Sequence, residues 1–297
     1  MGISIGLDIG GTKIAGAAFD ENGHDVVKAI ASTPQDYDSF LQACCTVIEQ
    51  IEQQCGKAES VGACSPYADE NVNANIPCLI GKPLRLDLER LLRRSIPFGN
   101  DANCAALAEA LEGAGKGYRA VFGLILGTGV GGGFVFDGHV LAGRNGLAGE
   151  IGHLPLPYYE PADGPRVDCG CGQMGCIDKL ASGPALARLY KQMTGSDGDA
   201  HDIMAAFKAH DPGATAVLDH FYTVVAKALV TVLHSFDPDI ITVSGGLSHL
   251  PGIYTEVPKR WGLYAVNKNP VTKLVPAKFG ATAGLRGAAW LGRASGR

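Results

Sequence analysis

The sequence predicts a two-lobed α/β protein, and three observations support this prediction. The chain has 297 residues, more than the about 100–200 residues of a typical single domain. A strand, a glycine-rich turn and a second strand follow one another in 3–19, and the same order returns in 121–136. Stretches with apolar residues at helical spacing lie between and after these units. The glycine-rich segment 113–117 marks the expected boundary between an N-terminal lobe (1–117) and a C-terminal lobe (118–297).

The first lobe begins with two short strands. Residues 3–7 and 14–19 are apolar runs on either side of a glycine-rich turn. The dipeptide Asn22-Gly23 predicts the next reversal of the chain. We therefore expect a strand, a turn and a second strand at the start of the fold.

The rest of the first lobe alternates helical and extended segments. Apolar residues near helical spacing predict a surface helix over 37–55, and 60–64 fits a buried strand. The segment 65–83 is rich in Pro, Asn and Asp, which is typical of a long ordered loop that binds a ligand. Residues 102–111 are alanine-rich and predict a helix.

The second lobe repeats the opening of the first. A strand over 121–126 leads into a glycine-rich turn, and a further apolar strand covers 134–136. A long helix over 214–236 and a strand over 240–243 follow. A terminal helix over 281–291 is expected to pack back on the N-terminal lobe.

Composition argues against several classes of protein. The formal net charge is −5, so there is no basic excess with which to displace counterions from nucleic acid. The N-terminus shows no signal-peptide pattern, and no run reaches the roughly 18–20 apolar residues of a membrane span. We expect a cytoplasmic protein without a nucleic-acid or membrane partner. Nine cysteines, an odd number, predict mostly reduced thiols instead of a disulfide framework.

The first glycine-rich turn has the residues of a phosphate-binding hairpin. Gly10 and Gly11 would let backbone amides approach an anion, and Thr12 and Lys13 add a hydroxyl and a positive charge. Asp8 cannot contact phosphate itself because like charges repel, but its carboxylate could hold Mg²⁺ directly or through water. An ordinary hairpin with a turn aspartate explains the same residues.

The second glycine-rich turn, LGTGVGGG at 126–133, follows the same logic. Two such turns on opposite sides of a cleft could hold successive phosphates of one nucleotide. A glycine pair after the strand at 240–243 would let a flat group such as adenine lie against the backbone, although such pairs more often only make a turn. The expected nucleotide-binding residues of this lobe are Gly127, Thr128, Gly129, Gly131, Gly245 and Gly246.

Asp101 lies in the segment Asn100-Asp101-Ala102-Asn103, which follows an extended stretch and precedes a helix. This position places its carboxylate at a helix N-terminus, where it could act as a general base. Capping of the helix by Asn100 or Asp101 explains the same residue types, and the local sequence alone favours the cap.

Four residues have the chemistry of a tetrahedral metal site. His153, Cys169, Cys171 and Cys176 provide four good ligands for Zn²⁺ and leave no open position, which predicts a structural site. A cluster of reduced cysteines without metal is the alternative. Glu150 lies three residues before His153, so one helical turn would bring both side chains to one face. By itself, Glu150 also fits a solvated surface acid.

Five motifs in this order resemble the ROK family of sugar kinases and repressors. They are LDIGGTK at 7–13, NDAN at 100–103, LGTGVGGG at 126–133, GEIGH at 149–153 and CGCGQMGC at 169–176. The resemblance implies a two-lobed actin-like (ribonuclease-H-like) ATPase fold, with ATP and sugar in a central cleft and usually a homodimer. It also implies ATP, Mg²⁺ and a structural Zn²⁺ as cofactors.

The resemblance implies a role for each matching residue. Asp101 would be the catalytic base, Asp8 would serve Mg²⁺, and the two glycine turns with Gly245-Gly246 would hold ATP. The three cysteines would form the zinc site with His153. The expected sugar contacts are Asn75, Asn100, Asp101, Glu150, His153 and Asp178.

Two positions depart from the family pattern. Asp178 stands where the family commonly has a glutamate, and its shorter side chain could reach the sugar only through water. Ala281 stands where an aspartate is frequent, which removes a helix cap or polar tie.

The substrate follows from smaller resemblances. Asn75-Ile76-Pro77, Gly81–Leu84 and the cysteine motif look like bacterial N-acetylglucosamine kinases, which implies phosphorylation of that sugar at the 6-hydroxyl. Ser65-Pro66-Tyr67 and Asn145-Gly146 also resemble bacterial fructokinases of the same family. A sugar-responsive transcriptional regulator and a sensor without turnover are the alternatives of a different class. The first phosphate turn begins at Asp8, without the preceding DNA-binding helices of the family's repressors, which argues against a regulator.

Overall fold

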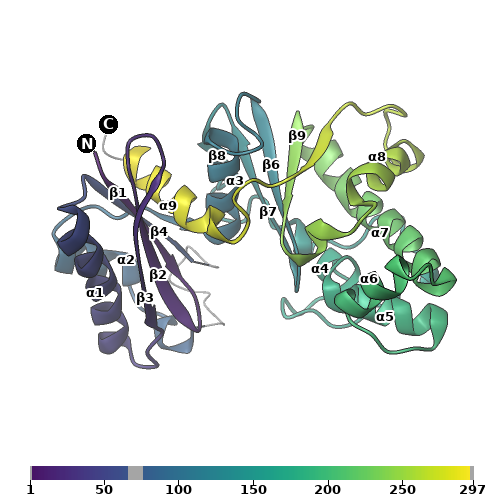
Figure 1. The fold of residues 1–297 in the computed structure, drawn as a ribbon, viewed down its shortest axis with the longest axis horizontal. Coiled ribbons are helices and arrows are strands. Elements are labelled where there is room, and N and C mark those ends of the chain that lie inside the picture. Colours follow the sequence, from purple (N-terminus) through teal and green to yellow (C-terminus); the bar gives the residue numbers. More distant parts are fainter. Residues whose placement is uncertain (1, 66–75, 295–297) are drawn as a thin grey trace.

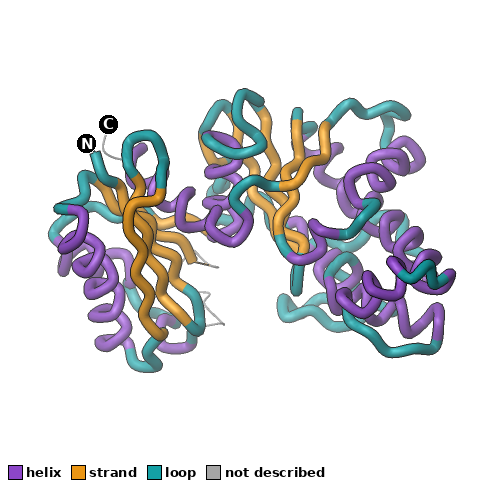
Figure 2. The backbone as a smooth tube through the Cα atoms, in the orientation of Figure 1, coloured by secondary structure: helices purple, strands orange, loops and turns teal. Residues whose placement is uncertain are grey.

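The computed structural model describes residues 2–65 and 76–294 and contains two five-stranded sheets, each with helices against it (Figure 1, Figure 2). The predicted α/β organisation in two lobes is confirmed. Asn75 lies outside the described residues.

The first sheet has the strand order β3-β2-β1-β4-β5. The central strand β1 pairs antiparallel with β2 and parallel with β4. The bounds of the elements in this part of the chain are β1 (Ser4–Ile9), β2 (Lys13–Phe19), β3 (Asp25–Ser32), α1 (Tyr37–Cys55), β4 (Ser60–Ser65), a 3₁₀ turn (Pro77–Leu79), α2 (Leu84–Leu92) and β5 (Phe98–Asn100).

Helix α1 has the predicted bounds, and its ends explain why. The Asp36 side chain accepts a hydrogen bond from the backbone N–H of Ser39 (2.9 Å), which caps the first turn. Gly56 follows the last turn with φ +85°, a conformation that glycine adopts without strain. The buried face, which includes Phe40 and Ile48, packs into the core of the first lobe.

The second sheet repeats the arrangement of the first, with the order β10-β9-β6-β7-β8. Its central strand β6 pairs antiparallel with β7 and parallel with β9, as β1 does with β2 and β4. The bounds are β6 (Ala120–Leu126), β7 (Val130–Phe136), β8 (His139–Val140), α4 (Ile177–Leu180), α5 (Gly183–Thr194), α6 (Ala200–Lys208), α7 (Pro212–Phe236), β9 (Ile240–Ser244), α8 (Ile253–Tyr264) and β10 (Lys273–Pro276).

Helices α3 (Asp101–Leu111) and α9 (Ala283–Ala294) lie between the two sheets. Helix α3 packs against β6 and β7 of the second sheet, whereas α9 packs against β1 and β4 of the first, and the two helices contact each other (Figure 1). A Cβ added at Gly6 would lie 1.8 Å from the backbone oxygen of Leu285, so only glycine permits this approach of α9 to β1. Helix α9 therefore covers a sheet built from the opposite end of the chain, whereas α3 covers the sheet whose strands directly follow it in the sequence.

Helix α7 is the central helix of the second core. By length and hydropathy alone it could cross a membrane, contrary to the expectation that no segment would meet that criterion. Most of its side chains are buried in the protein, which is typical of a core helix. Lys227 in its middle is 1% exposed and forms an ion pair with Asp163 (2.9 Å), so the charge has a partner inside the protein.

Candidate functional site

At the turn from β5 into α3, the capping residue is Asn100, not Asp101. The Asn100 side chain accepts hydrogen bonds from the backbone N–H groups of Ala102 (2.9 Å) and Asn103 (3.2 Å), so Asn100 is the cap. Asp101 is the first helical residue, and its carboxylate also accepts from Ala102 (2.7 Å). Because the Asn100 amide caps the helix, the Asp101 carboxylate is not needed to start it.

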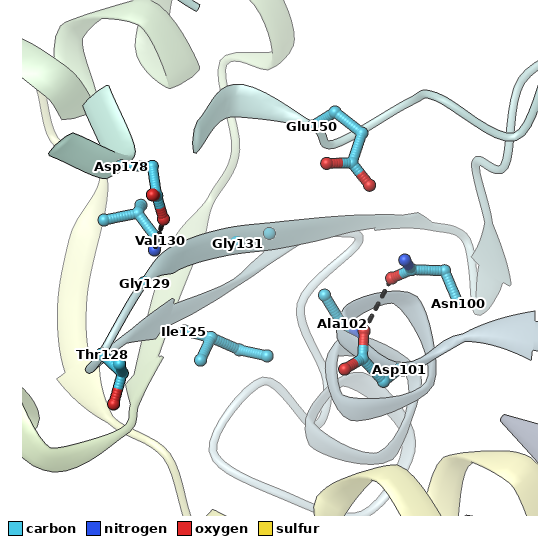
Figure 3. A pocket seen from close by; sticks show the side chains of 11 residues that line it. Asn100, Asp101, Ala102, Ile125, Thr128, Gly129, Val130, Gly131, Glu150 and Asp178 are labelled. Carbon is cyan, nitrogen blue, oxygen red and sulfur yellow. Dashed lines mark hydrogen bonds between the residues drawn. The ribbon is translucent and has the colours of Figure 1, made fainter. Parts of the chain in front are cut away.

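A pocket of about 560 Å³ opens beside this turn (Figure 3). Asp101 lies at the start of α3, Glu150 directly precedes the 3₁₀ turn Ile151–His153, and Asp178 lies in α4. Five of the predicted site residues with side chains therefore surround one cavity. The lining residues are Asn100, Asp101, Ala102, Ile125, Thr128, Gly129, Val130, Gly131, Gly132, Glu150 and Asp178.

The glycine turn of the second lobe forms one wall of the pocket, and Gly245 and Gly246 lie next to it in space. The turn closes with a hydrogen bond from the Gly127 N–H to the Gly129 oxygen (2.9 Å). An added Cβ at Gly127 would lie 3.6 Å from the nitrogen of Gly246, so the two glycine motifs are adjacent in space. Gly245 has φ +89°, and a side chain there would meet the Leu126 carbonyl. The structure thus brings together the predicted nucleotide-binding glycines of the second lobe.

The glycine turn of the first lobe does not line this pocket. Gly10 donates to the Lys13 oxygen (3.0 Å), which closes the hairpin, and the Thr33 hydroxyl donates to the Gly10 oxygen (2.7 Å). Gly11, Thr12 and Lys13 are exposed. Gly11, Thr12 and Lys13 are therefore open to solvent at the tip of the turn, whereas the Gly10 amide is engaged within it.

Three carboxyl groups around the site have raised pKa values. Burial raises the pKa of Asp8, and the charge of Asp101 raises it further. Burial also raises the pKa of Asp101. For Glu150, burial is the main cause of the raised pKa, and the charge of Asp101 adds to it while His153 opposes it. Negative groups held this close in a partly buried site are stabilised by a divalent cation, so the donor set fits Mg²⁺.

Glu150 and His153 lie at the two ends of one short helical turn. A 3₁₀ turn covers Ile151–His153, and the His153 Nε2 atom lies 3.9 Å from the Glu150 carboxylate. The other ring nitrogen, Nδ1, lies 3.5 Å from the Cys169 sulfur. His153 therefore faces a pocket carboxylate with one nitrogen and the cysteine cluster with the other, as the spacing of the two residues predicts.

The predicted metal ligands form one cluster. Ligand atoms of His153, Cys169, Cys171 and Cys176 all lie within 4.8 Å of one another. The sulfurs of Cys171 and Cys176 are 3.7 Å apart. Two thiolates on one tetrahedral metal at the metal–sulfur distance of zinc are separated by about 3.8 Å. The four residues could therefore hold one tetrahedral metal ion.

Asp178 has a partner that the sequence did not indicate. Its Oδ1 accepts a hydrogen bond from the backbone N–H of Val130 (2.8 Å), and its Oδ2 lies 2.9 Å from the Lys179 ammonium. A Cβ on Gly129 would lie 2.6 Å from Asp178 Oδ1, which explains the glycine there. Asp178 thus ties α4 to the glycine turn while it lines the pocket.

Some pocket residues were not predicted individually. Ile125, Val130 and Gly132 line the cavity together with the predicted glycines. All three lie in or next to the LGTGVGGG segment, so the motif was the available signal. Ala281 lies in a 3₁₀ turn (Gly280–Thr282) that runs directly into α9, so the helix begins as the continuation of that turn.

The chain is similar to known proteins over nearly its whole length. The model of the ROK family matches residues 4–295. The chain is 40% identical to an N-acetyl-D-glucosamine kinase of Yersinia pseudotuberculosis over 96% of this chain and 97% of that protein. It is 39% identical to the N-acetylgalactosamine kinase AgaK of a Shewanella species over 97% and 96%. The crystal structure of a ROK family glucokinase from Streptomyces griseus with glucose and AMPPNP has a TM-score of 0.76 and 30% identity, covering 99% of this chain and 100% of that one. The expected actin-like fold is confirmed.

Proposed function

Because this chain belongs to the ROK family, we propose that it is a cytoplasmic kinase that transfers the γ-phosphoryl group of ATP to the 6-hydroxyl of N-acetyl-D-glucosamine. One observation carries the proposal. Asn100 caps α3, so the Asp101 carboxylate is not required for that role. Asp101 lines the pocket together with Glu150 and the second glycine turn. The pocket therefore combines a base, polar groups for a sugar and amides for phosphate.

Asp101 is the general base in this proposal. A sugar hydroxyl is a poor nucleophile at neutral pH, so a carboxylate within hydrogen-bond reach accepts its proton as the oxygen attacks phosphorus in line. The bond from phosphorus to the β,γ-bridging oxygen breaks, and ADP leaves. The raised pKa of Asp101, caused by burial, makes its carboxylate a better proton acceptor than an exposed aspartate.

The remaining predicted residues bind and orient the substrates. Asn100, Glu150 and Asp178, which line the pocket, would contact sugar hydroxyls. His153, whose Nε2 lies 3.9 Å from Glu150, and Asn75, outside the described residues, would be further contacts. The backbone amides of the two glycine turns would hold the phosphates of ATP, and Gly245-Gly246 would face the adenine. Asp8 would hold Mg²⁺, which would neutralise negative charge on the transferred phosphoryl group.

A panel of sugars tests the proposal. N-acetyl-D-glucosamine, N-acetylgalactosamine, N-acetylmannosamine, glucose, mannose and fructose are compared in a coupled assay of ADP release. We expect the highest kcat/KM with N-acetyl-D-glucosamine and a value about tenfold or more lower with glucose, because glucose leaves the polar groups that meet the acetamide unpaired.

Other outcomes of this panel have defined meanings. A preference for N-acetylgalactosamine would place the chain with its Shewanella relative and overturn only the choice of sugar. A preference for fructose would support the fructokinase alternative. Absence of ADP release with every sugar would overturn the kinase activity and favour a sensor.

The cysteine cluster is proposed to hold a structural zinc ion. Metal analysis of the purified protein is expected to find about one zinc per chain, and Cys171→Ser is expected to lose it. Chelation should also weaken sugar binding, measured by calorimetry, because His153 then no longer holds Glu150 in place. Cys78→Ser, outside the cluster, is the matched control and should keep the metal. Fully active protein without metal would refute the zinc site.

A further inference from the structure

Cys64 lies directly beside Asp8 on the neighbouring strand. Asp8 and Cys64 are paired in the parallel register of β1 and β4, so both side chains project from the same face of the sheet. Gly6 and Gly62 pair two residues earlier, on the face that α9 covers. The Cys64 thiol therefore sits between the sheet and α9, next to the predicted magnesium carboxylate.

The contact between the two side chains is a hydrogen bond. The Cys64 sulfur lies 3.7 Å from Asp8 Oδ1, within the range for sulfur donors. An ionised carboxylate only accepts hydrogen bonds, so the thiol is the donor. Among residues 2–65 and 76–294, no other side chain donates a hydrogen bond to Asp8.

The surroundings hold the thiol in place. Cys64 is 0% exposed and clusters with Cys104 of α3 and Ala288 of α9, which are equally buried. Helices α3 and α9 thus fix the thiol from two sides, and the thiol in turn contacts the half-buried Asp8.

We propose that Cys64 is a positioning residue that fixes the Asp8 carboxylate for the cation of the nucleotide. Its hydrogen bond engages Oδ1, which leaves Oδ2 for the cation. Asp8 and Asp101 lie close enough for their charges to interact, so an untethered Asp8 would turn away from Asp101 when no cation is bound. The inference rests on the proposed function, because it assigns Asp8 to Mg²⁺.

Binding of Mn²⁺, a paramagnetic substitute for Mg²⁺, tests this role without turnover. The full chain is titrated with Mn²⁺ in the presence of a non-hydrolysable ATP analogue, and free Mn²⁺ is measured by electron paramagnetic resonance. Cys64→Ala is expected to raise the Kd for Mn²⁺ by about threefold to tenfold, as for loss of one weak hydrogen bond. Cys64→Ser keeps a donor and is expected to restore the Kd to within about twofold.

Cys44→Ala is the matched control, because Cys44 of α1 is also 0% exposed in the first lobe but lies outside this cluster. It removes the same sulfur volume from a core and is expected to leave the Kd for Mn²⁺ unchanged. In kinetics, Cys64→Ala should raise the Mg²⁺ concentration for half-maximal rate, while KM for the sugar stays constant.

Two results would overturn the positioning role. One is an unchanged Kd for Mn²⁺ in Cys64→Ala; the other is an equal rise in Cys64→Ser and Cys64→Ala, which would make Cys64 a packing residue. Infrared spectroscopy separates this failure from failure of the proposed function. The S–H stretching band that Cys64→Ala removes should shift in Asp8→Ala whether or not the protein is a kinase, and a band that does not shift would also overturn the role.

Discussion

Replacing Asp101 with asparagine is expected to lower kcat by about 10²-fold or more, because the amide cannot accept the proton of the attacking hydroxyl. The substitution preserves shape, and the asparagine oxygen can still accept the hydrogen bond from Ala102 that Asp101 accepts now. KM for the sugar should change less than kcat. Steady-state kinetics with N-acetyl-D-glucosamine and ATP measure both constants.

Two controls accompany the Asp101 variant. Its melting temperature should match the wild type, because Asn100 and not Asp101 caps α3. Asp87→Asn, on α2 and outside the pocket lining, should keep full activity. Near-normal turnover of Asp101→Asn would remove Asp101 from the role of base.

The pH dependence of the wild type has a defined sign. The base must be ionised, so kcat/KM falls as the pH drops through the pKa of the free enzyme's carboxyl groups. Because burial raises the pKa of Asp101, this acidic limb should lie at higher pH than for an exposed aspartate. Burial and, in addition, the negative charge of Asp101 raise the pKa of Glu150. The acidic limb therefore reports the titration of both coupled carboxyl groups.

Replacing Glu109 with alanine is expected to lower the free energy of unfolding by about 3 kcal/mol or more. Glu109 of α3 is 2% exposed. Its carboxylate accepts hydrogen bonds from the backbone N–H groups of Ala114 (2.9 Å), Lys278 (3.0 Å) and Phe279 (2.7 Å). The first of these donors lies on the connection from α3 to β6 and the other two on the connection from β10 to α9. The Glu109 side chain therefore joins the α3–β6 connection to the β10–α9 connection. Its loss leaves three backbone N–H groups without their acceptor.

Thermal unfolding measures this effect. A loss of that size corresponds to a fall in Tm of about 5 °C or more for a protein of this size. Glu49→Ala on the exposed face of α1 is the control and should change Tm little. If the Tm of Glu109→Ala equals that of Glu49→Ala, the three amides have found other acceptors. The Glu109 side chain then does not stabilise the junction of the two connections.

The sequence predicted those elements whose apolar residues recur with a regular period because one face of the element is buried in the core. The helix over 37–55 is an example, because one side of α1 packs into the core and its cap residues are local. Strand β3 was missed. It is an edge strand with Val26 and Ile30 exposed (45% and 65%), so its apolar residues do not mark a buried face.

The candidate site was predicted where its residues form motifs, and missed where they depend on distant partners. Asp101, Glu150 and the second glycine turn lie in short recognisable segments and meet at one pocket. The hydrogen bond from Val130 to Asp178 joins residues 48 positions apart, and Glu109 meets a partner 170 positions away. Contacts of this separation leave no local pattern. The paired glycines Gly6 and Gly62 were the available signal that a helix approaches the first sheet closely.

The packing of α9 on the first sheet has a consequence for biosynthesis. At about 5–20 residues per second, a ribosome takes roughly 15–60 s to make a chain of this length. The N-terminal sheet emerges early, yet α9, which shields one of its faces, follows all the strands and helices of the second lobe in the chain. That face carries Phe19 beside the small side chains of Ala15 and Ala17, so this apolar surface stays uncovered until α9 has been made. Synthesis of α9, and not emergence of the first half, is therefore the step after which both faces of the N-terminal sheet can be buried.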